Sequence, residues 1–308
     1  MDTMIRTICD VPNRSFAAAG QRLGESWPSW PKLPGLETVL AHTPLSVVSA
    51  AQWRWREGHH IPTRSLPTSN FALYLAGSGT VWLEGQPNPI RSGTLLITPR
   101  GWSQRVVHDP GHPYQALSLH AQMSVFGGER DLIDTLGLPR RIDLRTGQDE
   151  VLLLAMRSLA QLSAQRPPLW RSAADAWLTS MVMHLLQHYG DAAHNQHLPT
   201  DRDIARLAPA LAHIDACLVD GSIAVCELAA IVGLSEIATR RLFLRLTGLS
   251  PNRYIQSRRI ARACQLLRDG QSMTAVAAAV GCSDASVFHR LFRRHTGITP
   301  GRWLTEEH

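Results

Sequence analysis

Two stretches near the C-terminal end, TRRLFLRLTGLSP from Thr239 to Pro251 and FHRLFRRHTGITP from Phe288 to Pro300, are nearly the same sequence. The match extends backwards, so that residues 228–251 align with residues 276–300. The offset is 48 up to a shared glycine and 49 after it, which means that one residue is inserted in the second copy. The chain therefore holds two copies of one structural unit.

The helix-ending and helix-capping residues of each copy predict a helix-turn-helix. A short apolar helix, expected over residues 226–232 and again over 274–280, runs into a glycine that can end it in the left-handed conformation. A residue that can cap a helix follows, Ser235 in the first copy and Ser283 with Asp284 in the second. A second helix, basic on one side and apolar on the other, completes the motif.

The second helix of such a motif lies in the DNA major groove, where its early residues meet base edges. Arg241 and Arg290 occupy the same place in the two copies, and Arg can bind guanine O6 and N7 with two hydrogen bonds. The other exposed positions differ, so we expect the site read by one chain to be asymmetric. The expected base-reading residues are Ile237, Ala238, Arg240, Arg241, Ala285, Ser286, Val287 and Arg290. Residues expected to position phosphates are Arg245, Arg258, Arg293 and Arg294.

The connection between the two units supports this reading. Ser250 followed by Pro251 is a helix start, and the next stop is the pair Asp269 and Gly270. One helix over residues 251–268 would span roughly 27 Å. Helix-turn-helix units on one face of DNA are spaced by roughly 34 Å. A rigid rod of this length could hold two recognition helices in successive grooves.

The C-terminal region, about residues 205–305, resembles the AraC/XylS family of bacterial transcription regulators. The segments that carry the resemblance are LAAIVGLS, RLF, TGLSPNRYIQSRRIARACQLL, VAAAVGCSDAS, HRLFRRHTGITP and the Trp303 that follows. The resemblance implies seven helices, double-stranded DNA as partner and, by family habit, activation through RNA polymerase. Two residues depart from the family, because Thr239 stands where a buried Leu is usual and Cys282 where Phe is usual.

Composition sets the wider limits. The 308 residues are enough for two cores, and 44% hydrophobic with 18% charged residues is typical of a globular protein. From residue 204 onward the sequence has 13 arginines and 8 acidic residues, so +5 of the total charge of +6 lies in the last third. This excess of positive charge favours a polyanion as binding partner. The sequence has no apolar run of the roughly 20 residues that a membrane helix needs and no signal-peptide core. We therefore expect a cytoplasmic protein, with its five cysteines reduced.

In the N-terminal part of the chain, from about residue 45 to 120, apolar and polar residues alternate in short runs that are separated by Gly, Pro, Ser and Asn. This pattern is typical of the strands of a small barrel or sandwich. The run from Gly93 to Gln104 resembles the second cupin motif, with Gln104 where the metal-binding His would be. The first cupin motif is not matched, since His59 and His60 are adjacent. We expect a multidomain α+β protein with a cupin-like β-barrel before an all-α double helix-turn-helix domain, and no metal, cofactor or enzymatic activity. The alternative is a metal-dependent cupin enzyme fused to a DNA-binding tail.

In the AraC family a barrel of this type commonly holds a small effector. Aromatic walls are typical of ligand sites, although plain core packing is the alternative for each residue. The expected effector-binding residues are Trp53, Trp55, Tyr74, Trp82 and Trp102.

These patterns predict five segments. They are an N-terminal arm (1–35), a cupin-like β-barrel (36–145), a helical dimerisation segment (146–190), a linker (191–203) and an AraC-type DNA-binding domain (204–308). Two apolar helices are expected within the dimerisation segment, over 150–164 and 169–189. Family precedent makes them the seam of a homodimer, and packing against the chain's own barrel is the alternative.

Overall fold

The computed structural model of the protein describes residues 39–40, 42–55, 60–111, 113–190, 200–219 and 223–306. The expected N-terminal arm and His59 lie outside these residues, as does most of the expected linker. Among the described helices, none has the length and apolarity to cross a membrane.

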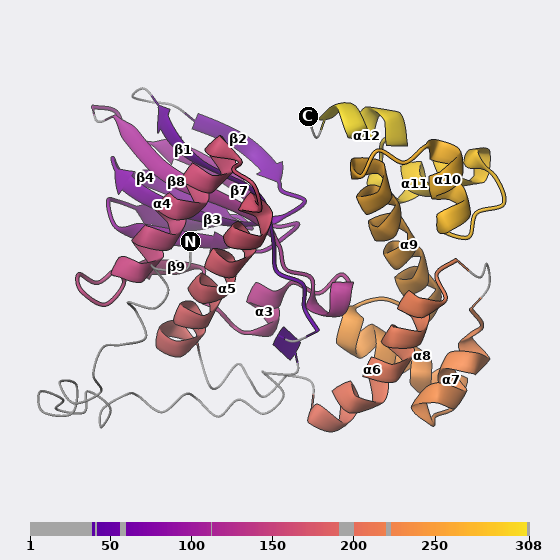
Figure 1. Ribbon diagram of the computed structural model, residues 1–308. Coiled ribbons are helices and arrows are strands. Elements are labelled where there is room, and N and C mark those ends of the chain that lie inside the picture. The colour runs from indigo at the N-terminus through magenta and orange to yellow at the C-terminus, as the bar shows by residue number, and fades with distance from the viewer. Residues whose placement is uncertain are drawn as a thin grey trace, which may run out of the picture. The chain divides into compact units, whose positions relative to one another are not determined.

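Two antiparallel sheets build the N-terminal part (Figure 1). The five-stranded sheet has the order β1 (Ser46–Trp55), β8 (Tyr114–Gln122), β3 (Ser69–Ala76), β6 (Thr94–Thr98) and β9 (Arg141–Asp143). The four-stranded sheet has the order β2 (His60–Ser65), β7 (Ser103–His108), β4 (Gly79–Leu83) and β5 (Gln86–Ile90). Over the described residues each sheet is hydrogen-bonded only within itself, so the strands form an open double sheet and the expected cupin-like β-barrel is not confirmed.

The five-stranded sheet is covered on both faces, which explains its apolar sequence. All five residues of β6 are buried. Leu95 and Ile97 point into the core beneath the helices, whereas Leu96 packs with Val81 and Val106 of the other sheet. A strand buried on both faces reads as a continuous apolar run, as TLLIT does here.

Two helices cover the outer face of this sheet, α4 (Glu150–Gln165) and α5 (Trp170–Tyr189), which confirms the two expected helices to within one residue. Figure 1 shows them lying side by side over β1 and β8. Ala174, Met181 and Leu185 of α5 are fully buried in the chain's own core. This face of α5 therefore packs on the sheet, and the dimer seam stays a prediction.

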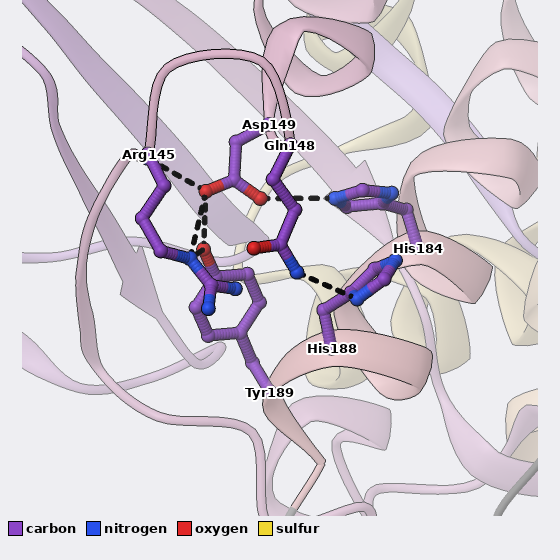
Figure 2. Close-up of polar contacts among 6 residues, drawn as sticks. All are labelled: Arg145, Gln148, Asp149, His184, His188 and Tyr189. Carbon is purple, nitrogen blue, oxygen red and sulfur yellow. Dashed lines mark hydrogen bonds and ion pairs between the residues drawn. The ribbon is translucent and has the colours of Figure 1, made fainter. Parts of the chain in front are cut away.

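A buried carboxylate ties the start of α4 to the end of α5, as Figure 2 shows. The side chain of Asp149 is 1% exposed. It accepts hydrogen bonds from the backbone N–H of Arg145 at 2.7 Å and from the hydroxyl of Tyr189, and His184 Nε2 lies 3.1 Å from its Oδ1. Burial alone would raise the pKa of the Asp149 carboxyl, but the hydrogen bonds of Tyr189, Arg145 and His184 hold this pKa below its usual value.

Seven helices make up the described part of the C-terminal region, as the resemblance implies. They are α6 (Asp201–Ala216), α7 (Val225–Val232), α8 (Glu236–Thr247), α9 (Pro251–Arg268), α10 (Met273–Ala279), α11 (Ala285–Thr296) and α12 (Pro300–Glu306). The joining helix α9 has the expected bounds. The predicted C-terminal bound of the linker, residue 203, is wrong. Thr200 caps α6, and the helix begins at Asp201, so residues 201–203 are helical.

The first helix-turn-helix contacts the β-rich part through the loop after β8, which contains the 3-10 helix η1 (Val125–Gly127). The backbone N–H of Glu129 donates to the Thr247 carbonyl oxygen at 2.8 Å, and the Tyr254 hydroxyl donates to the Phe126 carbonyl at 2.7 Å. Tyr254 is 2% exposed, and its burial raises the pKa of its hydroxyl. Gly128 permits the approach, since a Cβ there would lie 2.1 Å from the Thr247 oxygen.

Replacing Gly128 should therefore be costly. We predict that Gly128→Ala lowers the free energy of unfolding by about 1 to 3 kcal/mol, because the loop must move away from α8. Gly301→Ala is the matched control, as a Cβ there meets nothing within 4 Å. Chemical denaturation checks this, and equal stability of the two variants would contradict the close approach.

The Asp149 cluster gives a second prediction. Because the Asp149 pKa is depressed in the folded chain, its carboxylate stabilises the fold at neutral pH, and this stabilisation is lost as the pH falls below about 4. Asp149→Ala should lower the free energy of unfolding by about 1.5 to 3 kcal/mol at neutral pH and by less at about pH 3. The exposed Asp109→Ala serves as control. The same loss at both pH values would contradict a role for the charge.

Candidate nucleic-acid interface

The first helix-turn-helix is formed as the sequence predicts. α7 ends at Gly233, which adopts the left-handed conformation with a φ of 65°. Ser235 then caps α8, its side-chain oxygen accepting the N–H of Ala238 at 3.3 Å. Thr239 is fully buried, and its hydroxyl donates to the Ser235 carbonyl. Thr239 is smaller than the Leu that is usual in the family, but it is still buried between α8 and the core.

The second unit repeats this geometry with a different cap. Gly281 has a φ of 69°, and Asp284 accepts the N–H of Val287 at 2.8 Å. This backbone hydrogen bond is the main cause that lowers the pKa of the Asp284 carboxyl. Of the two expected capping residues, Asp284 caps α11, and the Ser283 hydroxyl lies 3.2 Å from its carboxylate.

Five of the eight expected base-reading residues are exposed on the two recognition helices, and three are half-buried. Ile237 is 66% exposed, and Arg240 lies 3.5 Å from Glu236 in an ion pair along α8. Arg241 and Arg290 are both exposed. Ser286 is exposed as well, whereas Ala238, Ala285 and Val287 are half-buried.

The four expected phosphate contacts divide into two groups. Arg293 and Arg294 are exposed in the last turn of α11, and the exposed Arg245 pairs with Asp203 of α6. Arg258 differs, because its Nε and Nη2 bind Asp215 at 2.8 and 3.1 Å in a two-bonded ion pair. The guanidinium of Arg258 is therefore used to join α9 to α6.

A cleft of about 510 Å³ lies beside the start of α8. Sequence reasoning missed one of its basic residues, Arg206 of α6. The spacing of Arg206 from Asp203 puts both on one side of α6, but only the packing of α6 against α8 brings them to the recognition helix.

The expected effector residues do not form one cluster. The rings of Trp53 and Trp55 stack with their centroids 5.4 Å apart. The ring centroid of Tyr114 lies 5.2 Å from that of Trp55 and 5.2 Å from that of Tyr74. These three rings, of Trp55, Tyr74 and Tyr114, gather between the sheets. Burial is the main cause that raises the pKa of Tyr74 to about 12. Trp102 packs at the edge of this core, beneath the guanidinium of Arg140.

Trp82 lies elsewhere. It alternates with the buried Val81 and Leu83 along β4, so its ring faces outward, where the Arg105 guanidinium covers it at 4.1 Å. Gln104 is 7% exposed and points inward. Among the described residues no three His, Cys, Asp or Glu side chains are grouped so that they could hold a metal ion.

Two capped helix-turn-helix units on one connecting helix define a DNA-binding domain. Residues 228–306 match the family model described as a helix-turn-helix domain. None of the curated proteins matches the chain.

Several solved structures are similar to this chain. An AraC-type transcriptional regulator from Chromobacterium violaceum is 28% identical over 33% of this chain and 92% of its own, with a TM-score of 0.31. ToxT from Vibrio cholerae, bound to an unsaturated fatty acid, is 10% identical over 84% and 95%, with a TM-score of 0.42. The C-terminal domain of the response regulator yesN from Fusobacterium nucleatum is 22% identical over 30% and 92%, with a TM-score of 0.29.

The ion pair of Arg258 leads to a prediction. Arg258→Gln should lower thermal stability and leave the salt dependence of DNA binding unchanged, because its guanidinium is bound to Asp215. Arg294→Gln, at an exposed position of α11, should instead reduce the slope of log affinity against log salt by about 0.9. Titration of labelled DNA at several salt concentrations separates the two, and equal slopes for both variants would contradict the division.

Proposed function

We propose that this protein is a sequence-specific transcription regulator that reads two successive major grooves with one chain. The observation that carries the proposal is the repeated unit, in which Arg241 and Arg290 are exposed at the same position of two capped recognition helices. The 18 residues of α9 span roughly 27 Å, close to the distance between successive grooves. The concentration of positive charge after residue 204 supports a polyanionic partner.

The further parts of the proposal concern partners. We expect a homodimer, with the helical segment of α4 and α5 as the seam, and an activator that contacts RNA polymerase. Leu154 and Leu169 of this segment are 55% and 82% exposed, which supports a surface available to a second copy. We expect no enzymatic activity, cofactor or metal.

A small-molecule effector is the remaining part. The rings of Trp55, Tyr74 and Tyr114 between the sheets support an aromatic ligand wall there, and the 46% exposed Trp53 stacks on Trp55. Trp82 is left out of this proposed wall because it faces outward.

The experiment that tests the reading function starts from random duplexes selected by the purified full-length chain and then footprinted. Protection of two adjacent major grooves per chain is the expected result. Arg290→Ala should weaken binding by roughly 1 to 3 kcal/mol and relax sequence preference in one half of the site, because the base-specific hydrogen bonds are lost.

Arg241→Ala is the matched variant in the other copy and should relax the other half of the site. An equal loss on every sequence would show that Arg290 contacts a phosphate. Protection of a single groove would contradict two reading units.

A further inference from the structure

The cleft beside α8 is lined by charged residues of both α6 and α8. It lies between α6 and α8 and measures about 510 Å³. Its polar wall consists of Asp203 and Arg206 from α6 with Arg241 and Arg245 from α8. Its remaining lining residues are Leu234, Ser235, Ile237, Ala238 and Leu242.

The charges of the cleft favour an anion. Three guanidinium groups face one carboxylate, so the lining has an excess of positive charge. Arg245 Nη2 lies 2.8 Å from Asp203 Oδ1, and their side chains are 59% and 24% exposed. Within the described residues, Arg206 and Arg241 have no hydrogen bond or ion pair of this kind. Arg206 is therefore available to a ligand, while Arg241 is the residue expected to read a base.

We propose that this cleft binds one backbone phosphate of DNA, and that Asp203 competes with this phosphate for Arg245. The inference rests on the proposed function and names one of its contacts. A guanidinium binds a carboxylate and a phosphate with the same fork of N–H donors. In the free protein Asp203 therefore pairs with the Arg245 guanidinium, the group that the phosphate would bind.

The position of the cleft fits a DNA strand. Ile237 and Ala238, which are expected to meet bases, form part of the same lining as Arg206. A strand whose bases reach these two residues brings its backbone past the cleft, where the apolar wall can contact deoxyribose. Arg206 is then a phosphate-binding residue, and Asp203 weakens binding to every sequence alike.

The test uses the full-length chain and a short duplex that carries its selected site, with binding measured at several salt concentrations. Arg206→Gln should bind more weakly, with a slope of log affinity against log salt reduced by about 0.9. Asp203→Asn keeps the size of the side chain and should bind roughly two- to fivefold tighter at low salt. Arg202→Gln is the matched control, since Arg202 is exposed on α6 and does not line the cleft.

A double variant separates competition from general repulsion. In an Arg245→Gln chain Asp203 no longer has the guanidinium with which it pairs, so adding Asp203→Asn should give no gain. Thermal melting of each variant checks that α6 is intact, because Asp203 also lies in the first turn of this helix.

The inference is overturned if Arg206→Gln keeps the wild-type slope, if Arg202→Gln has the same effect as Arg206→Gln, or if the gain from Asp203→Asn persists without Arg245. These outcomes leave the proposed function intact, provided that the wild-type chain binds its site and that Arg290→Ala weakens it. A wild-type chain that selects no duplex contradicts the proposed function, and the phosphate site with it.

Discussion

One helix belongs to two hydrophobic cores, and this constraint fixes the DNA-binding region. The first half of α9 supplies Tyr254 and Ile255 to the core that holds the first helix-turn-helix. Its second half supplies Ile260, Ala263 and Leu267 to a separate core with Phe288 and Phe292 of α11. Because both cores pack on the same rod, neither recognition helix can turn about α9 without breaking its own packing.

The first core does not end at the helix-turn-helix. Leu242 and Phe243 of α8 belong to the same continuous set of buried residues as the face of the five-stranded sheet that α4 and α5 cover. The hydrogen bond from Tyr254 to the Phe126 carbonyl lies where these parts join. The second unit packs around a separate hydrophobic core. The two copies are thus alike in local structure and different in what they are attached to.

The local features of the C-terminal region could be predicted from the sequence because their causes are local. Gly233 and Gly281 need the left-handed conformation, and Ser235 and Asp284 need only the N–H groups three residues on. The same alternation that predicts β4 also places Trp82 outside, between the buried Val81 and Leu83, and could have removed it from the effector residues.

Other features depend on partners that are distant in the chain. Arg258 is bound to Asp215, 43 positions away, and no pattern around either residue indicates the pair. Arg206 meets α8 only through the packing of α6. Whether strands close into a barrel depends on hydrogen bonds between the first and last strands of a sheet, which alternation does not specify.

The two recognition helices on α9 are not interchangeable, since Ile237, Ala238 and Arg240 in one stand against Ala285, Ser286 and Val287 in the other. A rod with different ends has a direction. A chain that reads DNA with both ends can bind a given site in one orientation only, and so distinguishes upstream from downstream. Whatever the β-rich part carries is then delivered to a defined side of the site.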